Sequence, residues 1–493
     1  MFRTILNIFK IPELRTKLLF TIGLLCVYRI GFYIPLPGVD THALSSFVSS
    51  SSSSPLGQIS SYLSLFSGGN LGLSTIFGLG IMPYISAAII FQLLGTVIPS
   101  LEKLQKEGEP GMRKINEWTR YATVGLCLIQ SFVWMGYLTR SSASSPHGFL
   151  YADTFYHHYT LFWISGLVSL TAGSVFLMWL GEQIDAYGIG NGVSLIIMAG
   201  IVARMPAAIQ DVWDQSSFRV SSAGSHPYGI GTVLFLIAAF VGVSAAAITL
   251  EMGQRRIGIQ QAKQMRGRKM YGGMSNQYLP LRVNHGGVMP IIFASSLILI
   301  PNVLLGWLAP RFGQFYVFQV IQESLEPGHY IYIVLYVIMI FFFSYFWNTV
   351  QFQPKEMADQ LRDYGSFIRN LRPGPRTAEY LEQVMTRITY CGAAFLAVIA
   401  LMPTIVARYM GVSFMITQFL GGTGLLIVVS VLLDFIYRVE ANLVMRNYGG
   451  LLDGGQESAG PASRKPRKTP PTPSSTGSPK TLPGRDNIKG SAA

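Results

Sequence analysis

The hexapeptide Gly-Ile-Met-Pro-Tyr-Ile at residues 80–85 returns as Gly-Val-Met-Pro-Ile-Ile at residues 287–292, each time inside a long apolar run. Gly, Met and Pro stand in register, so we interpret the two runs as copies of one repeat, although short apolar sequences also coincide by chance. A proline inside a membrane helix frees a carbonyl that lipid cannot satisfy, so we expect Pro83 and Pro290 to face protein or water. Paired Gly/Pro interruptions in matching helices indicate a functional centre between two related, inverted halves.

The composition around these runs excludes an ordinary soluble protein. The 493 residues are 50% hydrophobic and 12% charged, with a mean hydropathy of +0.39, whereas soluble domains carry about 25% charged residues. A helix of about 20 apolar residues crosses a bilayer. We predict ten such spans, at residues 18–36, 75–98, 121–139, 159–181, 189–203, 229–250, 286–309, 330–351, 388–405 and 412–434.

Positive charge is concentrated on one side of this predicted topology. Of the 37 Lys and Arg, 31 lie in alternate segments on the side of the amino terminus, five lie on the other side, and Arg29 lies within the first span. Lys and Arg accumulate in cytoplasmic loops, so this asymmetry predicts that both termini are cytoplasmic and that the number of spans is even.

The expected organisation follows from these spans. Its parts are a cytoplasmic interfacial helix at 1–17, an N-terminal half at 18–205 with spans one to five, a C-terminal half at 206–435 with spans six to ten, long cytoplasmic loops at 251–285 and 352–387 that we interpret as docking surfaces, and a disordered cytoplasmic tail at 452–493. The serine run at 49–54 is expected to be a flexible spacer on the outer side.

Branched aliphatic residues surround the predicted breaks, and none of the central stretches of spans two, seven or ten carries a charge. The branched aliphatic residues are Ile81, Ile85, Val193, Ile197, Ile292 and Ile427. Residues four apart share a helix face, and an uncharged aliphatic ring would resist wetting and hold back ions. Spacing alone favours the simpler alternative, in which these side chains face lipid or pack in the core.

The sequence contains none of the usual nucleophile, metalloprotease or nucleotide-binding motifs. We therefore predict that the protein is not an enzyme and uses no cofactor or metal. A secondary transporter of a small solute is the alternative, because it also has inverted repeats and broken helices, but ion coupling needs acidic or polar ligands at mid-membrane. An intramembrane protease is a third alternative. It would need paired catalytic residues inside its spans, and the predicted spans contain no such pair.

Several longer stretches carry a family resemblance. They are Phe-Ser-Gly-Gly at 66–69, Leu-Gly-Ile-Met-Pro-Tyr-Ile-Ser at 79–86, Trp-Leu-Gly-Glu-Gln-Ile at 179–184, Gly-Ile-Gly-Asn-Gly at 188–192, Gly-Gln-Arg-Arg at 253–256, Leu-Pro-Leu-Arg-Val-Asn at 279–284 and Gly-Gly-Thr-Gly-Leu-Leu-Ile at 421–427. Over most of residues 10–450 the sequence resembles the SecY family of protein translocase channels. The resemblance implies an all-α membrane protein with ten transmembrane helices in two inverted five-helix halves around a central hourglass pore.

The resemblance also implies roles for particular residues. The six aliphatic residues would form a pore ring that closes around a translocating chain, with Val193 standing where isoleucine is common, and the ring becomes the favoured interpretation. A plug would lie near 61–74 and include Phe66, Ser67, Gly68, Gly69 and Asn70. Spans two and seven would form a lateral gate that includes Pro83, Gln92 and Pro290.

Partners are implied in the same way. The cations expected to contact the ribosome or the SecA motor are Arg255, Arg256, Lys263, Arg266, Arg268, Lys269 and Arg372, and clustered cations suit phosphate. The resemblance further implies SecE and SecG as complex subunits, signal-sequence-bearing polypeptides and membrane lipids as partners, and the bacterial plasma (inner) membrane as the location. The expected function is a central channel that passes unfolded secretory proteins and releases membrane segments laterally, driven by an external energy source.

Overall fold

The computed structural model describes residues 12–41, 43–44, 74–144, 150, 159–216, 229–261, 264–266, 269–271, 277–295, 297–298, 301, 320–321, 324–325, 329–368, 371–410, 416 and 423–457. The chain divides into two compact units, Met1–Ala441 and Asn442–Ala493. In the second unit, only the end of helix α19 lies within the described residues. All other helices and strands belong to the first unit.

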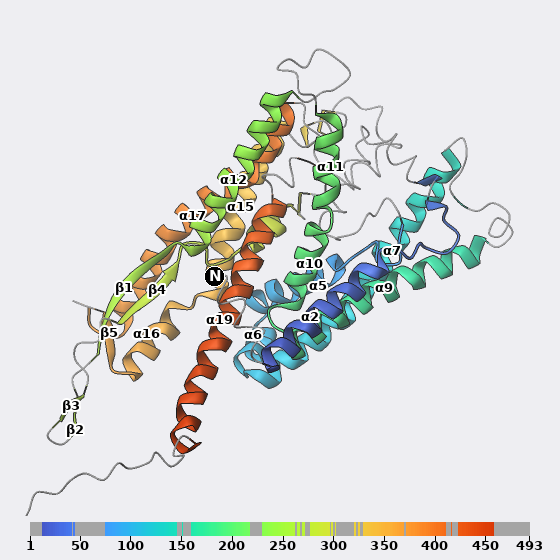
Figure 1. Cartoon of the computed structure of the whole chain (residues 1–493). Coiled ribbons are helices and arrows are strands. Elements are labelled where there is room, and N and C mark those ends of the chain that lie inside the picture. Colours follow the sequence, from blue (N-terminus) through green and yellow to red (C-terminus); the bar gives the residue numbers. More distant parts are fainter. Residues whose placement is uncertain are drawn as a thin grey trace, which may run out of the picture. The chain divides into compact units, whose positions relative to one another are not determined.

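The amino-terminal helices of the first unit pack mainly on one another (Figure 1). Helix α7 packs against both α5 and α9, and α9 also packs against α2 and α10. The bounds of these helices are α2 Pro12–Gly31, α5 Met82–Val97, α6 Pro99–Lys106, α7 Glu109–Ser144, α9 Tyr159–Tyr187, α10 Gly192–Val202 and α11 Met205–Gln215. Residues 12–17, predicted to belong to a separate interfacial helix, form the first turns of α2, while residues 1–11 lie outside the described residues.

A second group of helices packs around α17, which contacts α12, α15 and α16 (Figure 1). The bounds of this group are α12 Ile230–Met252, α15 Tyr330–Gln351, α16 Pro354–Asp363 and α17 Pro375–Met410, and the chain continues into helix α19, Thr423–Glu457. A further helical segment covers residues 289–295. The largest cluster of buried hydrophobic side chains takes members from both groups, from Tyr28 of α2 to Ile427 of α19.

Many of the helices are long and apolar enough to cross a membrane. Within the described residues, five helices meet that criterion, at Thr160–Tyr187, Gly192–Asp214, Ile230–Met252, Tyr330–Asp363 and Pro375–Met402, and α5 with α6 forms a sixth if this pair, bent by 103°, is one span. Each of the ten predicted spans overlaps a helix, the seventh over residues 289–295 and 297–298. The chain is thus mostly helical, and the count of ten spans stays a prediction.

The two repeat prolines begin helices, whereas the sequence predicted that they would interrupt them. Helix α5 begins at Met82, directly before Pro83, and the second helix begins at residue 289, directly before Pro290. The first N–H groups of a helix have no intrahelical acceptor, so proline loses nothing there. The preceding Gly80 and Gly287 have φ values of 59° and 58°, a left-handed conformation that favours glycine. Both copies therefore share one local geometry.

A small antiparallel sheet joins the two predicted cytoplasmic loops, although the sequence predicted an all-α chain. Its order is β4-β1-β5, where β1 is Gln254–Gln261, β4 is Gln277–Arg282 and β5 is Ser366–Ile368. A separate hairpin pairs β2, Gln264–Arg266, with β3, Lys269–Tyr271. The apolar face of the sheet packs on a cluster that includes side chains of α17, so the two loops form one structure.

Candidate functional site

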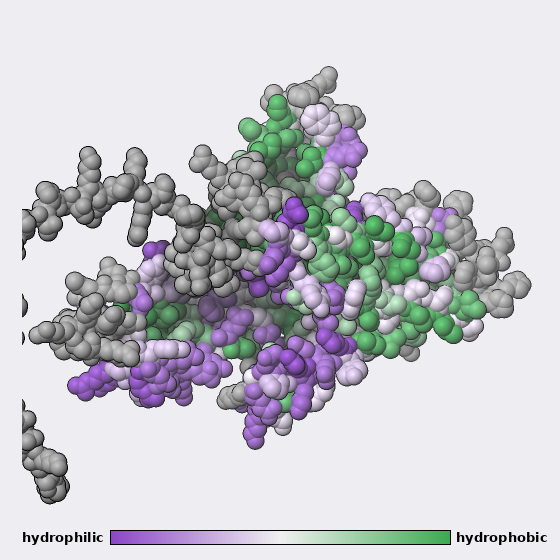
Figure 2. Space-filling model, turned by 60° about the horizontal axis from the view of Figure 1, so that its bottom comes forward, coloured by the Kyte–Doolittle hydropathy of each residue, from purple (hydrophilic) through white to green (hydrophobic). Residues whose placement is uncertain are grey.

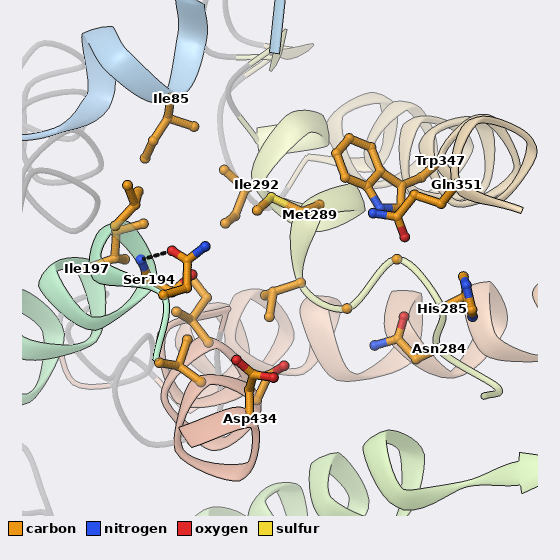
Figure 3. A pocket seen from close by; sticks show the side chains of 18 of the residues that line it. Ile85, Ser194, Ile197, Asn284, His285, Met289, Ile292, Trp347, Gln351 and Asp434 are labelled. Carbon is orange, nitrogen blue, oxygen red and sulfur yellow. Dashed lines mark hydrogen bonds between the residues drawn. The ribbon is translucent and has the colours of Figure 1, made fainter. Parts of the chain in front are cut away.

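A cavity of about 500 Å³ lies among elements from both groups of helices. Its walls come from α5, α10, the end of α12, the segment around 289–295, α15 and α19. In Figure 3, Ile85 of α5, Ile197 of α10 and Ile292 point toward one another at one side of the cavity, while Asn284, His285 and Asp434 lie at another side. The cavity therefore has an aliphatic end and a polar end.

Five of the six predicted ring residues line this cavity: Ile85, Val193, Ile197, Ile292 and Ile427. The sixth, Ile81, is only 2% exposed and belongs to the same hydrophobic cluster as the others, but it does not line the cavity. The five isoleucines are buried, and Val193 is half-buried. The simpler alternative of packing in the core is compatible with this geometry, and the ring role stays a prediction.

The repeat explains why two of these side chains meet. Ile85 and Ile292 occupy the last position of the two hexapeptides. The backbone N–H of Ile85 donates to the carbonyl of Ile81 at 3.1 Å, and that of Ile292 donates to the carbonyl of Val288 at 3.2 Å. Two copies of one glycine-proline helix start thus deliver an equivalent isoleucine to the same cavity.

Polar groups near the break between α9 and α10 hold the start of α10, which carries two of the aliphatic residues. The side-chain oxygen of Asn191 accepts a hydrogen bond from the backbone N–H of Ser194 at 3.0 Å and caps the helix. One carboxylate oxygen of Asp185 accepts from the N–H of Gly192 at 2.7 Å. Asp185 of α9 is thus a second acceptor at the start of α10, and the two bonds fix where Val193 enters the cavity wall.

The remaining charged groups of the polar end have partners. The side-chain amide of Asn284 donates to Glu251 at 3.2 Å, and Arg438 forms a salt bridge with Asp434 at 2.8 Å. Glu251 and Asn284 were not among the site residues predicted from the sequence. Glu251 and Asn284 both lie beside the predicted cytoplasmic ends of spans six and seven, and this shared position is the sequence signal that could have identified them.

His285 lies at this polar end, outside the helices. Its ring packs edge-on against the ring of Phe352, with the centroids 6.0 Å apart. Burial lowers the pKa of His285 below its usual value, and the nearby Arg282 cation lowers it further. The imidazole is therefore neutral at physiological pH.

The predicted gate residues are divided between two environments. Gln92 of α5 lines the cavity, whereas Pro83 and Pro290 are buried at the starts of their helices. The predicted plug residues, Phe66, Ser67, Gly68, Gly69 and Asn70, lie outside the described residues. Among the described residues, no group of three His, Cys, Asp or Glu is arranged to hold a metal ion.

The predicted contact cations lie on the two joined loops, at 251–285 and 352–387. Arg255 and Arg256 are exposed on β1, and Arg372 is exposed before α17. Arg266 is the last residue of β2, and Lys269 is the first residue of β3. Lys263 and Arg268 lie outside the described residues. Figure 2 shows hydrophilic side chains gathered over the region of β1, β4 and α16, and hydrophobic side chains over α2, α7 and α9.

The chain matches known proteins over most of its length. Residues 75–436 match the protein family described as SecY. The "Protein translocase subunit SecY" of Haemophilus influenzae is 42% identical over 446 residues, which covers 89% of this chain and 94% of that relative. The subunits of the same description from Escherichia coli K12 and Streptomyces scabiei are 41% and 39% identical and cover 89% and 90% of this chain and 94% and 98% of their own lengths.

Solved structures share the fold. One described as "The structure of a protein conducting channel" has a TM-score of 0.58 at 17% identity and covers 90% of this chain and 94% of its own. Another, "Sec61 in the Canine ribosome-channel complex from the endoplasmic reticulum", has a TM-score of 0.53 at 18% identity with the same coverage. These matches confirm the predicted class of mostly helical membrane channel fold.

Proposed function

The chain belongs to the SecY family of protein translocase subunits, which are protein-conducting channels and not enzymes, and from this premise we propose that it forms the central pore of a Sec translocase. In this role it passes unfolded secretory proteins across the membrane and releases membrane segments laterally into lipid. The alternative of a small-solute transporter is dropped, because the relatives are translocase subunits. The protein is a multi-pass membrane protein, and we assign it to the bacterial inner membrane with both termini in the cytoplasm, on the 31-to-5 charge asymmetry.

The aliphatic end of the cavity is our candidate for the pore constriction. The observation that carries this proposal is the convergence of five uncharged aliphatic side chains from four separate segments on one cavity. An apolar constriction resists wetting and so holds back ions when it is empty. It also offers no specific partner to a passing side chain, which suits a channel that accepts arbitrary sequences.

The polar end is our candidate for the cytoplasmic entrance. It carries Asp185, Glu251 and Asp434, and each of these carboxylates has a hydrogen-bonding or ionic partner in the protein. The Arg438 cation offsets the charge of Asp434, and the other two carboxylates already accept hydrogen bonds, so all three hold a passing ionic side chain less strongly than free carboxylates would. An unfolded chain would therefore enter a wet vestibule with little specific retention before it reaches the aliphatic end.

The moving parts are proposed on the family premise. We assign the lateral gate to α5 and the helix after Pro290, with Gln92 as a polar contact beside the cavity. We assign the plug to residues 66–70. Gly80 and Gly287, each two residues before the start of a gate helix, have a left-handed backbone conformation. They support this assignment, because a hinge places a large backbone change in few residues.

The partners are proposed on the same basis. The exposed Arg255, Arg256 and Arg372 suit a ribosome or a SecA motor at the joined cytoplasmic loops. A solved relative of the fold is a ribosome-channel complex. SecE and SecG would complete the translocase. The motor, the ribosome or the membrane potential would supply the energy, since the sequence holds no nucleotide-binding motif.

Polar substitution of the constriction tests this function. Ile427→Asn should raise the ion conductance of the resting channel and should let precursors with defective signal sequences be exported, because an amide favours wetting where isoleucine opposed it. Ile427→Leu keeps an apolar side chain of similar volume and is the matched control, with conductance close to wild type. Unchanged conductance and unchanged export stringency in Ile427→Asn, and likewise in Ile85→Asn, would exclude these residues from the constriction.

A further inference from the structure

One face of the β4–β1 ladder is exposed and carries cations beside aromatic rings. Side chains alternate along a strand, and the ladder pairs Gln254 with Arg282, Arg256 with Pro280 and Gly258 with Tyr278. We call these six residues the outer sheet face, and all of them are exposed. The alternating residues Ile257 and Leu281 are buried against the cluster beneath the sheet.

Two arginines of this face lie over tyrosine rings. The guanidinium of Arg256 lies 4.7 Å from the ring centroid of Tyr278, its diagonal neighbour on β4. Near the cavity, the guanidinium of Arg282 lies 5.9 Å from the ring centroid of Tyr437. A cation over an aromatic ring is restrained by the ring, while the N–H groups at the edge of the guanidinium stay available to an anion.

Arg256 lies in a stretch of sequence that is rich in cations and poor in acidic residues. Residues 252–322 contain no Asp or Glu, and the loop at 251–285 holds seven Lys and Arg. In the part of the chain that the structure describes, Arg256 takes part in no ion pair. A planar guanidinium beside an exposed aromatic ring, in a cation-rich loop, suits the phosphate groups of RNA, which accept paired N–H donors.

We propose that Tyr278 is a positioning residue that holds the Arg256 guanidinium in place for a phosphate of ribosomal RNA. This inference rests on the proposed contact between the joined loops and the ribosome. Tyr278 is 47% exposed and sits at the diagonal register position, so its ring fixes the direction of Arg256 along the outer sheet face. Tyr278 acts through Arg256, and its effect on binding depends on that guanidinium.

The neighbouring Arg255 provides an internal comparison. It carries the same charge one residue earlier, but alternation directs it to the side of the sheet opposite Arg256 and Tyr278. No tyrosine ring of the described residues holds its guanidinium. Coupling between Tyr278 and Arg256, without coupling between Tyr278 and Arg255, is therefore the signature of positioning.

The test is a titration of the full-length protein in lipid nanodiscs with vacant bacterial ribosomes, over a series of salt concentrations. Tyr278→Leu should weaken binding about two- to fivefold, the amount of an exposed cation–π contact. Tyr278→Phe keeps the ring and should bind like wild type. In the Arg256→Ala background, Tyr278→Leu should have no further effect, whereas in the Arg255→Ala background it should again weaken binding about two- to fivefold.

The outcomes separate the two levels of the proposal. If the wild-type protein does not bind ribosomes at low salt, the ribosome contact fails, and the role of Tyr278 fails with it. If the wild type binds and Arg256→Ala weakens binding, the contact stands. If Tyr278→Leu weakens ribosome binding equally with and without Arg256, Tyr278 does not position Arg256. The same conclusion follows if Tyr278→Leu leaves the affinity for ribosomes unchanged.

Discussion

The close approach of α9 and α10 at Gly192 gives the sharpest prediction about the constriction. A Cβ atom added at Gly192 would lie 2.0 Å from the carbonyl oxygen of Gly181 and 2.8 Å from its carbonyl carbon. Even a tight Cβ contact needs 3.0–3.4 Å, so Gly192→Ala must displace the start of α10 from α9 by about 1.0–1.4 Å, the difference between these distances. The obstacle is backbone, which cannot rotate away as a side chain would.

That displacement should have two measurable consequences. Overpacking of this kind costs about 1–3 kcal/mol of unfolding free energy. Gly192 is also followed directly by Val193 and, one turn later, by Ile197, both of which line the cavity. Moving α10 opens the aliphatic end on one side, so the resting ion conductance should rise along with the loss of stability.

Purified channel in liposomes or planar bilayers provides the assay, together with thermal unfolding in detergent. Gly242→Ala is the matched control, because it makes the same change on α12 where an added Cβ meets nothing within 4 Å. It should leave the conductance unchanged and should not lower stability, since alanine is the better helix former. Wild-type conductance and wild-type stability in Gly192→Ala would refute the reasoning that α10 is held against α9 as part of the constriction.

Two further predictions concern the polar end of the cavity. Asn191→Ala removes the cap on Ser194 and should lower stability by about 1 kcal/mol, while Asn191→Asp keeps an acceptor and should retain most of it, as thermal unfolding would reveal; equal losses would contradict the cap. The second is a pH dependence, because burial lowers the pKa of His285 in the folded protein below its usual 6.5. The fold binds fewer protons than the unfolded chain there, so its stability is fully present above about pH 6.5 and falls as the pH drops below that value. His285→Gln should reduce the difference between unfolding midpoints at about pH 7.5 and about pH 5.5; an unchanged difference would contradict the assignment.

The repeat and the aliphatic residues could be predicted because their signals are local. Gly80 and Gly287 recur in register, and they adopt the same left-handed conformation. The helix starts could not be located from the sequence, because the run before Met82 is as apolar as α5 itself and hydropathy does not distinguish a buried turn from a helix. Pro83 was therefore expected inside a helix and is found at its beginning.

The small sheet of β4, β1 and β5 was missed for a different reason. Strand β1 reads Gln-Arg-Arg-Ile-Gly-Ile-Gln-Gln, so only Ile257 and Ile259 alternate in it, and its partner β5 lies at Ser366–Ile368, about a hundred residues later in the chain. Such pairing depends on tertiary structure, and β propensity itself changes with context. The contact between Arg256 and Tyr278 follows from the register of this sheet, so it could not be predicted from the sequence.

The most direct test of the account is crosslinking of a stalled secretory chain that carries one cysteine. The native Cys26, Cys127 and Cys391 would first be replaced by alanine. Cysteine at position 85, 292 or 427 should then crosslink to the stalled chain, and cysteine at position 237, where Ile237 is 56% exposed on α12, should not. If the three cavity positions crosslink no better than position 237, the polypeptide does not pass through the aliphatic end of the cavity, and the central claim is wrong.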